Sequence, residues 1–151
     1  MAVTAMPSST ISPVEVMKTV RTIAVVGASK NPEKEAHSVP RFLKDNGYRI
    51  IPINPTATEI FGEKAFPDLL SLPPEVAVQV EAIEVFRPSD ELPGVARQVV
   101  ELSKRHGKRY IVWAQLGLEN DEAKRILDEA GIPYVMDACM RVVHSIYARS
   151  R

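Results

Sequence analysis

A glycine, a serine and two lysines follow a short apolar run near the start of the chain, in an order suited to binding a phosphate group. The apolar run at residues 22–26 ends at Gly27 and opens into a polar, basic loop that contains Ala28, Ser29, Lys30 and Lys34. Glycine permits a sharp turn and a close approach by a ligand. The helix expected after the loop would offer unpaired N–H groups and the positive end of its dipole to an anion. These residues predict a site for a nucleotide or a nucleotide-like cofactor.

Other reactive side chains give weaker indications of chemistry. Cys139 and His144 would suit a thiolate and its base, but five residues apart on a helix they stand about 140° from each other and do not share a face. His37, just before the expected helix, is either a phosphate contact or an exposed loop histidine. Asp137 either orients a ligand group or caps the following helix.

Composition narrows the possible partners. The 151 residues include 19 Lys and Arg against 19 Asp and Glu, so nothing favours bulk attraction to nucleic acid or to an anionic membrane. Cys139 is the only cysteine, which excludes an internal disulfide and any site built from several cysteines, and suits a reducing cytoplasm. We therefore expect a cytoplasmic protein that binds a small molecule, without a membrane or nucleic-acid partner; any protein partner stays unknown.

The elements that would position the loop alternate along the chain. Apolar spacing and glycine stops predict helices at residues 13–20, 38–46, 89–106, 119–130 and 138–148. Strands are expected at residues 22–26, 48–53, 109–114 and 134–136, with a short one near 64–66. Ser38 is the expected N-cap of the second helix, with Pro40 in its first turn.

The segment at residues 76–86 has apolar residues at strand spacing, but three polar side chains interrupt it. Gln79, Glu81 and Glu84 are unusual in a buried strand, so only the last part of the segment is expected to be central. Strands that alternate with helices predict a parallel sheet with helices on both faces, a single-domain Rossmann-like α/β fold. Ligands of such sheets bind beyond the carboxyl ends of the strands. We expect residues 1–12 to be a flexible N-terminus and residues 13–151 to form the domain.

The second expected strand helps to decide which nucleotide fits. The loop at Gly27 keeps only the first glycine of the dinucleotide pattern G-x-G-x-x-G. Where an NAD-binding unit carries an acidic residue to hold the ribose hydroxyls, this chain has Asn54 and Pro55. Lys30, Lys34 and Arg41 then favour a ligand with more phosphate than NAD, such as coenzyme A (CoA).

Several short motifs, taken together, resemble a known family. They are Val25-Val-Gly-Ala-Ser29, Gly47-Tyr48, Pro52-Ile-Asn-Pro55, Phe86-Arg87, Trp113-Ala-Gln-Leu-Gly117 and Asp137-Ala-Cys139. Their order and spacing, over about residues 16 to 145, resemble the small CoA-binding proteins related to the nucleotide-binding domain of the succinyl-CoA synthetase alpha subunit. The resemblance implies a Rossmann-like sheet and CoA as the cofactor.

The resemblance also assigns positions in the site. It implies that the loop from Gly27 to Lys34 holds phosphates, that Asn54 and Pro55 border the adenosine part, and that two corners wall the path of the pantetheine arm, namely Phe86-Arg87 and Trp113 with Gln115. Val39, in the helix after the loop, completes the expected binding residues.

Three functions follow from these observations. The first is a stand-alone module that binds CoA or an acyl-CoA without catalysis of its own, because the resemblance implies that the second domain of the synthetase, with its phosphorylated histidine, is absent. The second is an NAD(P)-dependent enzyme on the same fold. The third is a subunit that assembles with a separate chain of an acyl-CoA synthetase-like complex.

Overall fold

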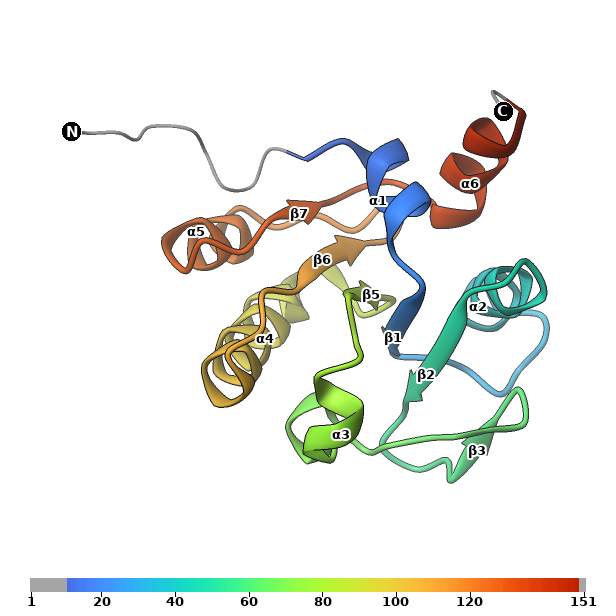
Figure 1. Cartoon of the computed structure of the whole chain (residues 1–151), viewed down its shortest axis with the longest axis horizontal. Helices are drawn as coiled ribbons and strands as arrows, with labels where there is room; N and C mark the ends of the chain where they lie inside the picture. The colour runs from blue at the N-terminus through green and yellow to red at the C-terminus, as the bar shows by residue number, and fades with distance from the viewer. Residues whose placement is uncertain (1–10, 150–151) are drawn as a thin grey trace.

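The computed structural model describes residues 11–149 as one parallel sheet with helices on both faces (Figure 1). The spatial order of the strands is β2 (Arg49–Ile53), β1 (Thr22–Val26), β5 (Ala82–Val85), β6 (Ile111–Ala114) and β7 (Tyr134–Val135). All four neighbouring pairs are parallel. The predicted Rossmann-like fold is confirmed.

The strand order reverses at β1. The chain passes from β1 outward to β2, and then returns to the other side of β1 to place β5, β6 and β7 in succession. In an open parallel sheet this reversal leaves a crevice at the carboxyl ends of the two strands that flank it. The sheet therefore places Gly27 and Phe86, the residues directly after β1 and β5, where a ligand is expected.

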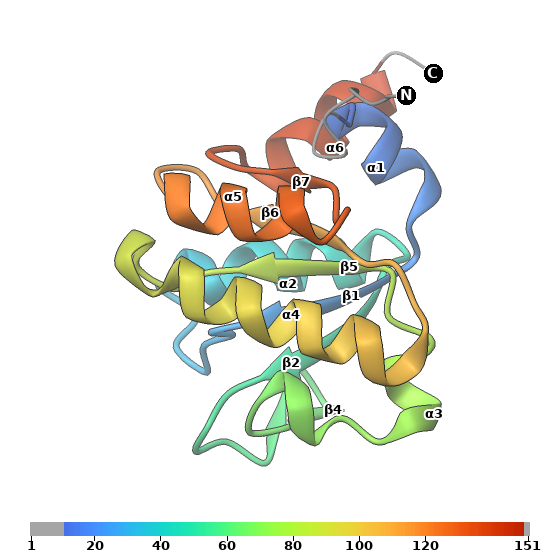
Figure 2. The same cartoon turned by 90° about the vertical axis from the view of Figure 1, so that its left-hand side faces the viewer.

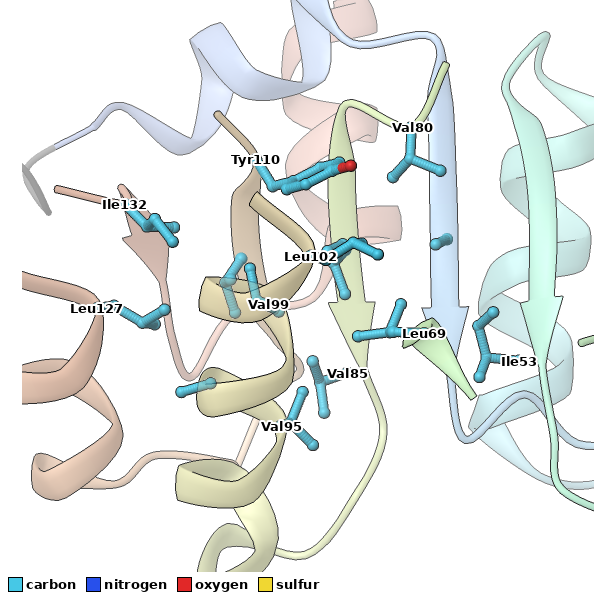
Figure 3. Close-up of a cluster of buried hydrophobic side chains, with 14 of the residues drawn as sticks. Ile53, Leu69, Val80, Val85, Val95, Val99, Leu102, Tyr110, Leu127 and Ile132 are labelled. Carbon is cyan, nitrogen blue, oxygen red and sulfur yellow. The ribbon is translucent and has the colours of Figure 1, made fainter. Parts of the chain in front are cut away.

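Each face of the sheet has its own core. The helices α1 (Pro13–Thr19), α2 (Glu35–Asp45) and α6 (Met140–Arg149) pack on one face, and α4 (Leu92–His106) and α5 (Asp121–Glu129) pack on the other. Figure 2 shows α4 and α5 in front of the sheet, and Figure 3 shows apolar residues such as Val99, Leu102 and Leu127 filling the space beneath them. Residues along each strand alternate between the two cores, as the strand period of two requires.

Helix α2 starts earlier than the sequence suggests. It begins at Glu35, with Lys34 at the N-cap, so the prediction of Ser38 as N-cap is wrong and Pro40 lies in the second turn. A proline there usually disrupts a helix, because it lacks the N–H that bonds to the carbonyl four residues back. Here that carbonyl, on Ala36, accepts the N–H of Ser29 at 3.1 Å instead. The helix continues because its missing bond is replaced by a bond from the loop.

The segment before β5 also differs from the expectation. Residues 74–77 form a short helix, α3 (Pro74–Ala77), and only residues 82–85 pair as a strand. Prolines at 73 and 74 favour a helix start, which overrides the apolar spacing. Glu81 lies just before β5 and accepts the N–H groups of Arg21 and Thr22, so its polarity serves the start of β1.

The remaining connections are short. A hairpin of β3 (Glu59–Ile60) and β4 (Glu63–Lys64) stands near the predicted strand at 64–66, and Phe66 bridges to Ile53 of the main sheet. Two 3₁₀ turns, η1 (Leu69–Ser71) and η2 (Ser89–Glu91), precede α3 and α4. The expected flexible segment, residues 1–12, lies outside the described residues except for Ile11 and Ser12, and Ser12 caps α1. Across residues 11–149, no helix has the length and apolarity to cross a membrane.

Candidate functional site

Gly27 forms the sharp corner between β1 and the loop that follows. Its φ is +86°, a left-handed value that favours glycine, and its N–H donates to the Ile53 carbonyl at 3.1 Å. A Cβ added at this position would stand 3.1 Å from the Phe86 carbonyl oxygen and 3.1 Å from Cδ of Arg87. The ends of β1 and β5 therefore approach closely here, and a side chain at position 27 would be strained at this φ and would require Phe86 or Arg87 to shift.

The loop after Gly27 is fixed to the helix that it precedes. The Ser29 N–H donates to the Ala36 carbonyl, and the Ser29 carbonyl lies 2.7 Å from Nδ1 of His37. A carbonyl can only accept, so Nδ1 of His37 carries the proton of this bond. The half-buried imidazole also packs against Phe61, with ring centroids 4.8 Å apart. His37 therefore supports the loop through its ring. This role differs from both roles considered from the sequence, a phosphate contact and an exposed loop histidine.

Replacing Pro40 by Ala should loosen this loop without weakening α2. The new N–H at position 40 would compete with Ser29 for the Ala36 carbonyl, while Ala is the better helix former. We expect the amide hydrogen of Ser29 to exchange about 2- to 10-fold faster, as for the loss of one hydrogen bond. The matched control is Pro13→Ala at the first position of α1, where an N–H has no acceptor within the helix. Equal exchange at Ser29 in the parent and Pro40→Ala would contradict this role.

The N-terminus of α2 is open toward this loop. Lys34 occupies the N-cap position but makes no side-chain capping bond, so the first turn of an 11-residue helix lacks the usual polar cap. Lys30 and Lys34 are exposed, and neither side chain forms a hydrogen bond or ion pair with another described residue. Arg41 instead lies further along α2 and pairs with Asp45 at 3.5 Å. Two cations and a helix N-terminus thus meet beside Gly27.

Asn54 joins the two loops at the ends of β1 and β2. Its Nδ2 donates to the Ala28 carbonyl at 2.8 Å, and its Oδ1 accepts the N–H groups of Thr56 and Ala57 at 2.9 Å each. Both ends of the amide are thus used within the protein. The structure makes Asn54 an anchor that fixes the first loop against the second.

A cavity of about 250 Å³ adjoins the corner on the α4 side. Of the predicted residues it contains Gly27, Pro55 and Arg87, and it adds Asp68 and Glu91, which sequence reasoning missed. Arg87 is exposed and forms two bonds with Glu91, Nε to Oε1 at 2.9 Å and a terminal nitrogen to Oε2 at 3.0 Å. The Arg87 side chain is therefore held in place by Glu91, four residues later in η2.

Three predicted binding residues, Ala28, Val39 and Trp113, lie in the core on the α2 face of the sheet. Val39 and Trp113 are fully buried, and Nε1 of Trp113 donates to the Ala138 carbonyl at 2.8 Å. Their side chains support the site from beneath: Val39 packs α2 onto the sheet, and Trp113 holds the segment between β7 and α6 over the end of β6. Phe86, half-buried, packs against the same core.

Glu84 and Gln115 are buried polar side chains near the same edge. Glu84 has no exposed surface and Gln115 has 2%, and their four terminal oxygen and nitrogen atoms make no hydrogen bond with any of the residues that the structure describes. Burial alone raises the pKa of Glu84 from its ordinary 4.5 to about 8. The sequence predicted Gln115 as a site residue but not Glu84. The only sign of Glu84 in the sequence was a charged side chain within an otherwise apolar strand.

The C-terminal reactive residues do not form one site. The Asp137 carboxylate accepts the Gly117 N–H at 2.7 Å, and thereby joins the loop after β6 to the loop after β7. Cys139 is partly buried beside it. His144 instead lies with its Nδ1 3.0 Å from the Tyr48 hydroxyl, near the amino end of β2 and so at the opposite edge of the sheet. Within residues 11–149, no cluster of histidine, cysteine and acidic residues is suited to hold a metal.

A family comparison agrees with this geometry. The model of a family described as the CoA binding domain matches residues 21–145, the span from the start of β1 to α6. The chain belongs to this family.

Two relatives place the chain within the CoA-binding domain family. It is 39% identical to YneT of Bacillus subtilis over 132 residues, which cover 87% of this chain and 91% of YneT. It is 27% identical over 133 residues to an ADP-forming acetate–CoA ligase II of Archaeoglobus fulgidus. That match covers 68% of this chain but only 19% of the ligase, so the chain is homologous to a small part of that enzyme.

Solved structures show the same fold. A Thermus thermophilus protein is 39% identical with a TM-score of 0.77, over 91% of this chain and 99% of that chain. The dinucleotide-forming acetyl-coenzyme A synthetase 1 of Ca. Korarchaeum cryptofilum is 28% identical with a TM-score of 0.58, over 75% of this chain and 25% of the synthetase. The CoA-binding domain thus occurs both as nearly a whole chain and as one part of a larger enzyme.

Proposed function

We propose that this chain binds coenzyme A, or an acyl-CoA, at the carboxyl edge of the sheet. The observation that carries the proposal is the open N-terminus of α2, where Lys30 and Lys34, in the loop that follows Gly27, have no side-chain partner among residues 11–149. Helix N-termini and lysines both bind phosphate groups. Membership of the CoA-binding domain family supports CoA as the phosphate-bearing ligand.

The proposed ligand follows the ends of the strands. Its phosphates lie at the loop of Gly27, Ala28 and Ser29, with Lys30 and Lys34 as counter-charges. Its adenosine borders Asn54 and Pro55, whose loop is fixed to the first by the Asn54 amide. Its pantetheine arm passes the Phe86-Arg87 corner toward Gln115 at the end of β6.

The end of β2 argues against NAD as the preferred ligand. An NAD site usually has a carboxylate there to hold the ribose hydroxyls. Asn54 occupies that position, and both ends of its amide are bonded to the protein. The positive loop lysines suit instead the 3′-phosphorylated ADP of CoA.

The proposed role is binding without catalysis by this domain alone. The similarity to the A. fulgidus ligase covers 19% of that enzyme, so its reaction is not carried over to this chain. The match with YneT covers 91% of that protein, which supports a role for the domain as a module in its own right.

Replacing Lys34 by Ala tests the phosphate corner. We expect Lys34→Ala to weaken CoA binding by about 1 to 3 kcal/mol, the range for a charge-assisted hydrogen bond, with the thermal unfolding temperature unchanged. Isothermal titration calorimetry at low and high salt would measure the difference, and salt should reduce it. The matched control is Lys104→Ala, an exposed lysine in the last turn of α4. Unchanged CoA affinity in Lys34→Ala at low ionic strength would show that this lysine is merely solvated.

A further inference from the structure

Glu84 and Gln115 carry polar atoms that the described protein leaves unsatisfied. Both oxygens of Glu84 and both terminal atoms of Gln115 are buried without a hydrogen-bond partner. Burying such groups without hydrogen bonds destabilises a fold. Two buried side chains with unsatisfied polar atoms, both near the proposed site, therefore require an explanation that the free protein does not supply.

The strand register puts the two side chains on the same face. Glu84 stands opposite Val25 on one side and Trp113 on the other. The Gln115 N–H donates to the Val85 carbonyl at 3.2 Å, which continues the β5–β6 ladder by one step. Gln115 is two residues beyond Trp113, so its side chain points to the face of Trp113 and Glu84. This is the face that α1, α2 and α6 cover.

Glu84 and Gln115 belong to β5 and to the segment after β6, the two strands that follow β1 in the sheet. Gly27 ends β1 and touches the backbone of Phe86, two residues after Glu84 on β5. Gln115 follows β6, the next strand along. A ligand whose phosphates lie at the start of α2 and whose arm crosses the ends of β1, β5 and β6 would reach Gln115 first, with Glu84 deeper on β5 on the same face. Leu116, directly after Gln115, is 62% exposed, so the chain reaches the surface immediately after Gln115.

We propose that Glu84 and Gln115 form a polar subsite that receives a carbonyl group of the ligand's arm, either a pantetheine amide or the thioester of an acyl-CoA. This inference rests on the proposed CoA site. The protonated Glu84 carboxyl and the Gln115 amide can each donate to a carbonyl oxygen, and their own carbonyl oxygens can accept an amide N–H. Binding would then satisfy the atoms that the free protein leaves unpaired.

The test compares three ligands by calorimetry: CoA, acetyl-CoA, and adenosine 3′,5′-bisphosphate, which keeps the nucleotide end and lacks the arm. We expect Glu84→Met and Gln115→Met to weaken an arm-bearing ligand by about 10-fold or more, the equivalent of a lost hydrogen bond to a buried group. Binding of the bisphosphate should not change. Glu84→Gln keeps a donor and an acceptor of the same shape, and should bind all three ligands like the parent.

Each outcome decides the inference. A loss for both CoA and acetyl-CoA supports recognition of an amide, and a loss for acetyl-CoA alone supports recognition of the thioester. Parent-like binding of all ligands by Glu84→Met and Gln115→Met would overturn the subsite, and so would an equal loss for the armless bisphosphate, which indicates a general change of fold. If the parent binds the bisphosphate but not CoA, the arm has no site here. If the parent binds none of the ligands, the proposed function itself fails.

Discussion

At pH 7 the Glu84→Gln variant should be more stable than the parent by about 3 kcal/mol. Burial raises the pKa of the Glu84 carboxyl to about 8 in the folded protein, against 4.5 as its ordinary value. The folded state therefore binds a proton that the unfolded state has released. The contribution of Glu84 to the free energy of unfolding is therefore fully present below about pH 4.5. It falls by about 1.4 kcal/mol per pH unit as the pH rises toward 8. Glutamine keeps the shape of the side chain and does not ionise.

Urea denaturation at pH 5, 7 and 8.5 would measure this difference. The advantage of Glu84→Gln over the parent should be small at pH 5 and grow as the pH rises. The control is Glu81→Gln, because the Glu81 carboxylate accepts two backbone N–H groups and its replacement should lower stability instead. Parallel pH curves for the parent and Glu84→Gln would show that the carboxyl does not titrate as its burial requires.

The Gly27→Val variant should lose measurable CoA binding. A β-branched side chain is strained at a φ of +86°, and its Cβ would stand 3.1 Å from both the Phe86 carbonyl oxygen and Cδ of Arg87. Backbone and side chain at the end of β5 would have to shift, and the space for phosphate would be filled. Titration calorimetry with CoA would measure the loss, and circular dichroism would show whether the sheet is retained.

Gly47→Val separates the local effect from general strain. Gly47 has a φ of +96°, but an added Cβ there would meet no atom within 4 Å, and the residue lies at the opposite edge of the sheet. Gly47→Val should cost stability through its backbone alone, about 1 to 3 kcal/mol, and keep its CoA affinity. If both variants lose CoA binding equally, the corner at Gly27 has no special role.

The architecture of the sheet was predictable because it depends on local patterns. Glycines at the ends of apolar runs located β1 and α4, the glycine after α4 also marked the approach to β6, and the alternation of strands and helices implied a parallel sheet. The start of α2 was not predictable, because Pro40 is tolerated only through a bond that Ser29 donates from another segment. The helix at 74–77 was missed because two prolines at its start outweighed the apolar spacing.

The candidate site was predictable in part for the same reason. Gly27 and the two lysines are adjacent in sequence, so their meeting at one corner follows from a single turn. The anchoring role of Asn54 depends on a contact 26 residues away, with the Ala28 carbonyl. That Glu84 and Gln115 lie near each other on one face depends on the register of β5 against β6, which no local pattern in the sequence reveals.

A comparative titration with CoA, dephospho-CoA, NAD and NADP tests the central claim most directly. We predict that CoA binds most tightly, and that dephospho-CoA binds more weakly because it lacks the 3′-phosphate that the loop lysines favour. NAD and NADP should bind more weakly than CoA, because Asn54 stands where a ribose-binding carboxylate would be needed. Binding of NAD that is tighter than binding of CoA would contradict the account.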